Sequence, residues 1–265
     1  MYGLNPYGGS MMEEKQQNEE IVEYALSIKD VHKSYGKKEV VKGVSFNVNK
    51  GEIYGYIGKN GVGKSTLIDC IVGLKDFNSG DIEIFGKSIK NNAVEAKSIF
   101  GYVPSEPTCY KMMSGREYLE FIASCYDLTQ EAFEGNVKYL QEKFSLPDED
   151  LDRRISDYSH GMQQKVCLMA SLIHNPKLWI LDEPTVGLDI MVYEVLLKMF
   201  KDYARAGNTV LITSHNLDLV SAICDKVAIV NNGVIAAELD FKKEPYKRKD
   251  LKRIFFRLYG VNNVN

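Results

Sequence analysis

Residues 58–65, which read GKNGVGKS, have the spacing G-x-x-x-x-G-K-[S/T] of a loop that binds nucleotide phosphates. Glycines let such a loop turn so that successive backbone N–H groups converge on one small volume, and a following helix adds its free N–H groups. Lys64 would place a charge on the β- and γ-phosphates, and Ser65 can supply a hydroxyl to Mg²⁺. The alternative is a glycine-rich strand-to-helix turn without a ligand, which would match this pattern only by chance.

Two acids and a histidine stand at the ends of apolar runs. Asp182 and Glu183 follow the run 178–181, and His215 follows the run 210–212. A carboxylate at the end of a buried strand is where a phosphate-loop protein holds Mg²⁺, and a second carboxylate can orient or deprotonate the attacking water. Taken alone, such acids are more often helix caps and such a histidine is more often structural. The glycine loop is what favours a catalytic interpretation.

The elements that must hold these residues follow from the spacing of apolar side chains. Alternating and continuous apolar runs predict strands, whereas repeats at three and four residues predict helices. We expect strands over residues 22–36, 40–58 (two strands with a turn at 49–51), 79–89, 98–104, 178–184, 209–215 and 227–239 (a hairpin turning at 232–233). We expect helices over 65–74, 114–145 (two helices), 162–175 and 192–206. The pattern predicts an α/β core interrupted by an all-helical insert.

The composition argues against several classes of protein. The formal net charge of −3 disfavours bulk binding of nucleic acid, which usually needs an excess of Lys and Arg. No apolar run approaches the roughly 20 residues that span a bilayer. Five scattered cysteines without C-x-x-C predict reduced, mostly buried thiols in a cytosolic protein. Residues 1–20 are predicted to be a disordered leader, and the basic residues 241–265 a solvated end.

Taken together, the motifs resemble those of the nucleotide-binding subunits of ATP-binding cassette (ABC) transporters. The resemblance extends from Ile21 to about Leu239 and includes the loop 58–65, the run LWILDEP and the segment YSHGMQQKV, which is similar to the LSGGQ signature of the family. It implies a P-loop NTPase core with a mixed or parallel sheet, an N-terminal antiparallel β region and an inserted α-helical subdomain. The cassette domain would cover residues 21–240, with the helical insert at roughly 105–175.

The resemblance also implies roles for individual residues. Asp182 would be associated with Mg²⁺ together with Ser65, Glu183 would be the general base, and His215 would sense the γ-phosphate. Tyr35 would stack on adenine, unless it is simply a core tyrosine. Ser159 and Gly161 would reach the γ-phosphate of an opposing subunit, and Asp189 would belong to the D-loop. The full set of nucleotide-binding positions that the resemblance implies is Tyr35, Gly58, Asn60, Gly61, Gly63, Lys64, Ser65, Thr66, Ser159, Gly161 and Asp189.

Two positions depart from the family pattern. Where the Q-loop normally carries Gln or Glu after Y-x-P, this chain has Ser105 followed by Glu106. A serine is too short to reach Mg²⁺ as the usual side chain does, so Glu106 or a water would have to take its place. His160 and Met162 replace a glycine and a glutamine of the signature, while Ser159 and Gly161 are kept. We expect the phosphate contact of the signature to survive.

The resemblance implies an ATP- and Mg²⁺-dependent ATPase subunit at the cytoplasmic face of the membrane. It would pair with a second copy or a paralogous cassette and drive a separate transmembrane permease. The form YS-x-GM resembles cassettes of bacterial exporters. A soluble cassette acting in translation or assembly is the alternative, although such translation factors carry two cassettes. A chromosome-maintenance ATPase is disfavoured because it would need a long coiled coil, for which the segment between Lys64 and the signature is too short. A non-enzymatic module is disfavoured because both Asp182 and Glu183 are present.

Overall fold

Strands β3, β8 and β7 form the centre of a six-stranded sheet with the order β10-β9-β3-β8-β7-β6, in which only β10 is antiparallel to its neighbour. A second, antiparallel sheet has the order β2-β1-β4-β5. The structure is a computed structural model that describes residues 24–185, 188 and 190–261. The strands are β1 Tyr24–Tyr35, β2 Lys38–Asn49, β3 Ile53–Ile57, β4 Ser79–Ile84, β5 Lys87–Ser88, β6 Phe100–Val103, β7 Leu178–Asp182, β8 Thr209–Ser214, β9 Lys226–Asn231 and β10 Val234–Asp240.

Some of the helices pack against the two sheets, and others form a separate helical subdomain. The α-helices are α1 Lys64–Ile71, α2 Ala93–Ile99, α3 Gly115–Ser124, α4 Gln130–Phe144, α5 Asp148–Leu151, α6 His160–Leu172, α7 Ile190–Arg205, α8 Leu217–Ile223 and α9 Lys247–Leu258, and a 3₁₀ turn lies at Ile155–Asp157. The α/β fold with an antiparallel N-terminal sheet and an inserted set of helices is the one that the sequence predicts. The leader predicted for residues 1–20 lies outside the described residues.

The central strands are buried on both faces, which explains their continuous apolar runs. All five residues of β3 and of β7 are buried. Because β3, β7 and β8 are parallel, their carboxyl ends meet at one edge of the sheet, where ligands of such sheets bind. This edge carries the phosphate-loop candidate, the two acids and His215.

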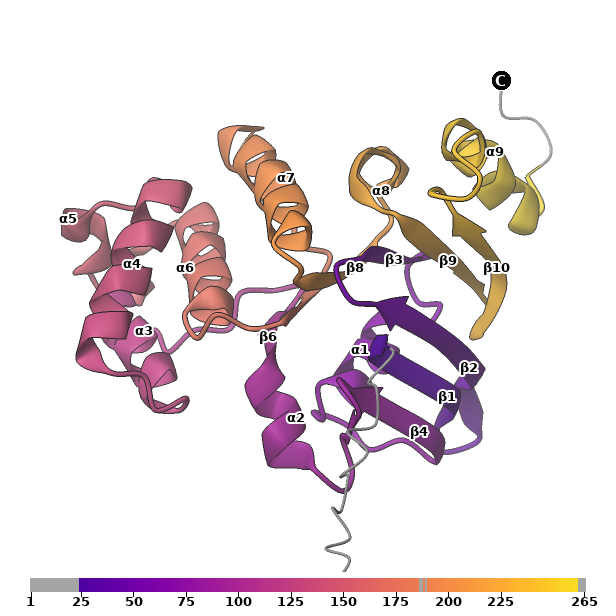
Figure 1. Cartoon of the computed structure of the whole chain (residues 1–265), viewed down its shortest axis with the longest axis horizontal. Coiled ribbons are helices and arrows are strands. Elements are labelled where there is room, and N and C mark those ends of the chain that lie inside the picture. Colours follow the sequence, from indigo (N-terminus) through magenta and orange to yellow (C-terminus); the bar gives the residue numbers. More distant parts are fainter. Residues whose placement is uncertain (1–23, 186–187, 189, 262–265) are drawn as a thin grey trace, which may run out of the picture.

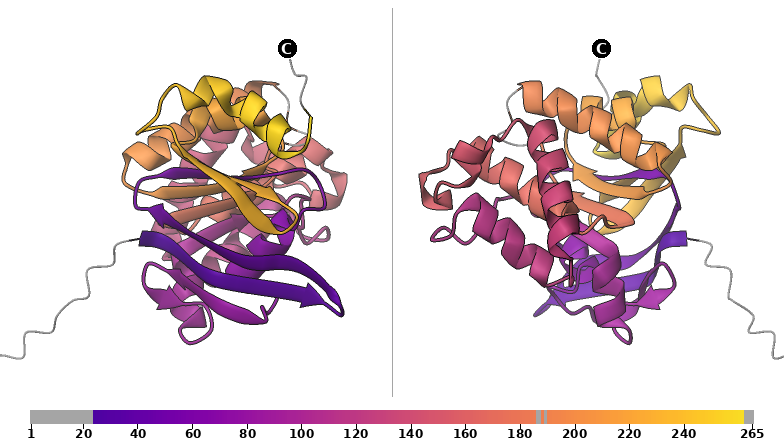
Figure 2. Two further views of the ribbon diagram at one scale, coloured as in Figure 1. Left: turned by 90° about the vertical axis from the view of Figure 1, so that its right-hand side faces the viewer. Right: turned by 60° about the vertical axis from the view of Figure 1, so that its left-hand side comes forward.

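The antiparallel sheet and α1 pack on one face of the six-stranded sheet (Figure 1, Figure 2). The aromatic ring of Phe46 on β2 stacks on Tyr54 of β3, with the ring centroids 4.9 Å apart. Leu67, Ile68 and Ile71 of α1 are fully buried in the same cluster. This packing fixes the start of α1, and therefore the loop before it, relative to both sheets.

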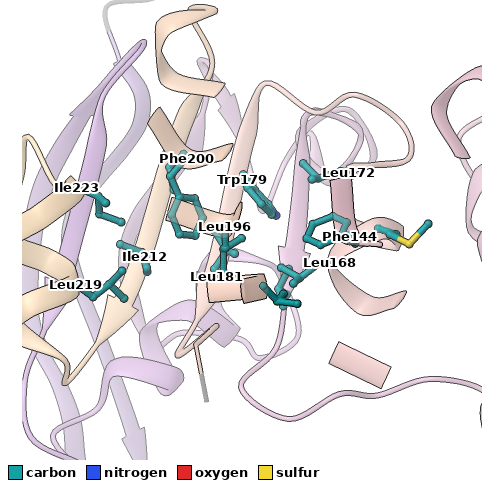
Figure 3. Close-up of a cluster of buried hydrophobic side chains, with 14 of the residues drawn as sticks. Phe144, Leu168, Leu172, Trp179, Leu181, Leu196, Phe200, Ile212, Leu219 and Ile223 are labelled. Carbon is teal, nitrogen blue, oxygen red and sulfur yellow. The ribbon is translucent and has the colours of Figure 1, made fainter. Parts of the chain in front are cut away.

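The opposite face of the six-stranded sheet joins the helical subdomain in one apolar cluster. Figure 3 shows it extending from Ile223 of α8 through Phe200 of α7 and Trp179 of β7 to Phe144 of α4. The ring centroids of Trp179 and Phe200 are 5.2 Å apart. Helices α3, α4, α5 and α6 lie together at one end of the molecule (Figure 1). The subdomain that carries the signature segment is therefore packed on the sheet that carries the loop.

The basic segment after Phe241 differs from the solvated end that the sequence predicts. It forms α9, which lies against α8 and β10 (Figure 1). Leu251 and Phe255, one helical turn apart, are buried, while the charges between them stay largely at the surface. The guanidinium of Arg248 donates to the carbonyl of Cys224 at 2.8 Å. The apolar positions at helical spacing are what hold this basic helix on the fold.

In the described residues, none of the helices has the length and apolar character required to cross a bilayer. All five cysteines are free, as the sequence predicts, and three of them are buried.

Candidate functional site

The glycine loop connects the buried strand β3 to α1 and requires glycine for steric reasons. Gly61 and Gly63 have φ of 80° and 104°, in the left-handed region that side chains disfavour. A Cβ on Gly63 would also lie 2.9 Å from the carbonyl oxygen of Val40 on β2. A Cβ on Gly58 would lie 2.8 Å from the carbonyl oxygen of Val230 on β9. Neighbouring strands thus approach the loop at both of its ends and fix its shape.

Lys64 is buried inside this loop, with 5% of its side chain exposed. Its ammonium donates to the carbonyl oxygens of Gly58 at 2.8 Å and Lys59 at 3.3 Å. It also lies 3.3 Å from Oε1 of Glu183. A buried ammonium is costly without such partners. The loop therefore holds one positive charge at its centre, next to the acid that ends β7.

Glu183 is held between Lys64 and His215. Its Oε2 lies 2.9 Å from Nδ1 of His215 and accepts the backbone N–H of that residue at 3.3 Å. Glu183 has a φ of 50°, which is strained for a side chain of this size. Two contacts from its N–H to Thr213, at 3.2 Å to the carbonyl oxygen and 3.2 Å to the hydroxyl, stabilise that conformation. In this backbone conformation the carboxylate lies beside the phosphate loop, with Oε1 3.3 Å from the Lys64 ammonium.

Asp182, the last residue of β7, is 2% exposed. The hydroxyl of Thr213 donates to its Oδ1. Ser65 lies at the first turn of α1 with its side chain exposed. Carboxylate and hydroxyl oxygens are the ligands that Mg²⁺ prefers, and Mg²⁺ in phosphate sites usually takes only one or two groups from the protein. The residues present therefore fit the Mg²⁺ site that the sequence predicts.

Three further residues of the predicted site lie at the loop, in α1 and at the end of β1. Asn60 is exposed within the loop, and Thr66 is half-buried in α1. Tyr35 ends β1 with 45% of the residue exposed, so it is not a core tyrosine. The ammonium groups of Lys33 and Lys75 lie 5.2 Å and 5.6 Å from its ring centroid. An exposed ring flanked by cations is available for stacking on a base that belongs to an anionic ligand.

The signature residues lie elsewhere, at the start of α6. Ser159 is the N-cap, and its hydroxyl accepts the N–H of Met162 at 3.3 Å. Ser159 is exposed and Gly161 is half-buried. Within the described part of the chain, neither residue hydrogen-bonds or forms an ion pair with the loop 58–65. Asp189, predicted for the D-loop, is outside the described residues.

After β6, Ser105 is half-buried and Glu106 is exposed. Neither side chain is hydrogen-bonded to Asp182 or Ser65 in the structure as described. Replacement of the missing Q-loop side chain by Glu106 or by a water stays a prediction.

Three residues at the site were missed in the sequence. Thr213 binds both Asp182 and Glu183, and a threonine within the apolar run TVLITSH is the signal that could have pointed to it. Gln164 of α6 is 1% exposed, and its amide donates to the carbonyl of Pro184 at 3.4 Å. Tyr259, at the end of α9, contacts the phosphate loop directly. No local pattern in the sequence links residue 259 to residue 59.

The family described as "ABC transporter" matches residues 41–186. This match covers more than half of the chain and includes the loop, the signature segment and both acids. The chain belongs to the ABC transporter family. It is an ATP-binding subunit of that family and an ATPase, as the sequence predicts.

The cassette is similar to the linearmycin resistance ATP-binding protein LnrL of Bacillus subtilis (strain 168), with 37% identity over 212 residues, which are 80% of this chain and 68% of that protein. It is 33% identical over 214 residues to the Nod factor export ATP-binding protein I of Rhizobium meliloti (strain 1021), covering 81% of this chain and 64% of that protein. A solved structure of an ATP-binding subunit of an ABC transporter superimposes with a TM-score of 0.83 at 29% identity, covering 89% of this chain and 99% of the other.

Proposed function

We propose that this cassette hydrolyses ATP with Mg²⁺ between two cassette subunits and thereby powers a separate transmembrane permease that exports its substrate. The observation that carries the proposal is the contact of the loop cation with the acid at the end of β7. Lys64 and Glu183 are 3.3 Å apart although they come from opposite halves of the chain. A fixed cation beside a carboxylate is suited to binding phosphate and activating water.

The residues of the site divide this work between them. A phosphate at the loop would draw the ammonium of Lys64 toward its oxygens and weaken the ion pair with Glu183. Glu183 would then be free to accept a proton from the attacking water, while His215 would hold the carboxylate at Oε2. Ser65 and Asp182 would hold Mg²⁺, which neutralises phosphate charge when bound. Tyr35 would stack on the adenine.

The signature residues support a site that is completed by a second subunit. Ser159 and Gly161 open α6 with an exposed helix start, separate from the loop of their own chain. Two chains related head to tail by a twofold axis would bring each helix start to the γ-phosphate bound by the other. The partner would be a second copy of this chain or a paralogous cassette, with Asp189 of the D-loop near the contact.

The proposal of export is supported by the names of two relatives, and that of a membrane partner by the family, which is one of transporters. One relative is named for resistance to linearmycin and another for export of Nod factor, and both are named as ATP-binding proteins. The cassette would act at the cytoplasmic face of the membrane, with residues 21–240 as the cassette and about 105–175 as its helical insert. Purification of the chain from its native membranes should bring along a permease with several membrane spans.

The variant Glu183→Gln tests the assembly directly. It keeps the shape of the side chain but removes the base, which should slow hydrolysis by about 10²–10⁴-fold. Bound ATP should then persist and hold two chains together. We expect light scattering to show a dimer with Mg-ATP and a monomer with ADP.

A second substitution provides the matched control. Ser159→Arg, added to Glu183→Gln, should abolish the dimer because it blocks the start of α6. Ser124→Arg, at another exposed serine of the helical subdomain, should leave the dimer intact. If Glu183→Gln stays monomeric under saturating Mg-ATP, the shared-site proposal is wrong.

A further inference from the structure

We propose that Tyr259, at the end of α9, is a positioning residue for ATP: its phenol holds the phosphate loop in the shape that places Lys64. The proposal rests on the ATP site proposed above and assigns a function to the basic C-terminal segment. It is based on contacts between residues 200 positions apart in the chain.

The phenol of Tyr259 bridges β9 and the phosphate loop. Its oxygen accepts the backbone N–H of Lys59 at 3.0 Å, and its proton is donated to the carbonyl of Val230. Burial raises the pKa of Tyr259, so the hydroxyl keeps the proton that it donates. The absent Cβ of Gly58 makes room for the phenol, because a Cβ there would lie 3.0 Å from the hydroxyl oxygen.

The peptide groups beside this contact are the ones that hold Lys64. The ammonium of Lys64 donates to the carbonyls of Gly58 and Lys59, and the N–H that Tyr259 accepts belongs to Lys59. Rotation of the peptide groups around Lys59 would therefore move an acceptor of Lys64. The Tyr259 hydroxyl opposes that rotation from outside the loop, while the ammonium of Lys59 lies 4.6 Å from the Tyr259 ring centroid.

Tyr259 is itself held in place before any ligand binds. Its ring centroid lies 4.8 Å from that of Phe255, which is 5% exposed. The side-chain amide of Asn231, at the end of β9, donates to the carbonyl of Leu258 at 2.9 Å. The end of α9 is thus bound to the same strand whose Val230 carbonyl faces the loop. A phenol held this firmly can restrain the loop without an entropic cost at the moment of binding.

The variant Tyr259→Phe removes the hydroxyl and keeps the ring. Loss of one hydrogen bond that leaves an N–H unsatisfied should raise the Kd for ATP by about three- to tenfold. KM should rise by a similar factor, while kcat stays within about twofold, because the loop binds phosphate in the ground state and the transition state alike. Exchange of the Lys59 amide proton with solvent should become faster.

Tyr246→Phe is the matched control, since Tyr246 precedes the same helix and its hydroxyl donates to Glu244, on the exposed turn before α9, instead of to the phosphate loop. Calorimetry with ATP, kinetics and amide exchange should show no change in this variant. A purely structural role of Tyr259 would lower the thermal stability and the folded fraction, but would leave the Kd of the folded protein and the Lys59 exchange rate unchanged. That outcome, or unchanged values throughout, overturns the inference.

Lys64→Ala separates failure of this inference from failure of the proposed site. If Lys64→Ala leaves ATP affinity unchanged, the loop is not the ATP site and both proposals fail. If Lys64→Ala abolishes binding and Tyr259→Phe does not weaken it, only the role of Tyr259 is refuted.

Discussion

At the scale of single residues, the site is organised by the ion pair of Lys64 with Glu183. Both residues could be predicted as functional, because each stands in a short motif whose spacing reflects its chemistry. Their contact could not be predicted, since it depends on the register by which β8 lies between β3 and β7. The same holds for Thr213, which reaches both acids only because its strand pairs with β7.

The buried position of Lys64 leads to a direct prediction. Lys64→Ala removes the positive charge at the centre of the loop, so binding of ATP should be lost at concentrations that saturate the parent chain. Charge-assisted contacts to phosphate are each strong, and Lys64 would make more than one. Isothermal calorimetry measures the loss. Lys177→Ala, at an exposed lysine before β7, should bind as the parent does; equal affinities of the two variants would contradict the assignment.

At the scale of elements, most strands and long helices could be predicted from apolar spacing, whereas the short and charged helices could not. Helix α8 has seven residues, too few to show a period, and begins where the Asn216 side chain accepts the N–H groups of Asp218 and Leu219. Helix α9 does contain apolar residues at helical spacing. Its basic composition obscured them, and only packing on α8 and β10 shows which face is buried.

The turn between α6 and β7 carries a titratable group that links it to β6. Nε2 of His174 donates to the carbonyl of Phe100 at 3.1 Å, and its ring stacks on Tyr126 with the centroids 3.7 Å apart. Its Nδ1 is buried and has no hydrogen-bond partner among residues 24–185, 188 and 190–261. A proton on Nδ1 would find no acceptor in this part of the chain. Burial accordingly lowers the pKa of His174 from 6.5 to about 4.

This lowered pKa predicts a loss of stability in mild acid. Between pH 6.5 and about 4 the unfolded chain binds a proton at His174 that the folded chain does not. The free energy of unfolding therefore keeps its full value above pH 6.5 and declines as the pH falls, by about 2 kcal/mol at pH 5. Urea unfolding of the parent and of His174→Gln at pH 7.5 and pH 5 measures it. The variant should lose less stability between the two pH values; equal losses would show that His174 does not contribute.

At the scale of the whole molecule, the helical insert and the sheet share one core. The apolar cluster between the six-stranded sheet and the helical insert includes Phe144 of α4 and Leu168 of α6. It also includes Trp179 of β7 and Phe200 of α7 (Figure 3). Units that share a core unfold together, whereas units with separate cores can unfold one after the other. The subdomain that would present Ser159 to a partner is therefore coupled energetically to the sheet that holds the loop.

The shared core predicts a single unfolding transition that one side chain can report. Trp179 is the only tryptophan, is fully buried, and lies at the junction of the two parts. Its fluorescence and the far-UV circular dichroism should change at the same urea concentration. Phe200→Ala removes a fully buried ring in contact with Trp179, which should cost about 3–5 kcal/mol and shift both signals together.

Tyr139→Ala, on an exposed position of α4, provides the control for this experiment, with 54% of the parent residue exposed. It should change the unfolding midpoint much less than Phe200→Ala, because about half of Tyr139 stays in contact with water in the folded protein. Separation of the two signals would be the contradicting result. If circular dichroism were lost before the Trp179 signal, the helical insert would unfold by itself, and the signature segment would move independently of the sheet. A single transition would instead show that the helical insert and the sheet unfold as one cooperative unit.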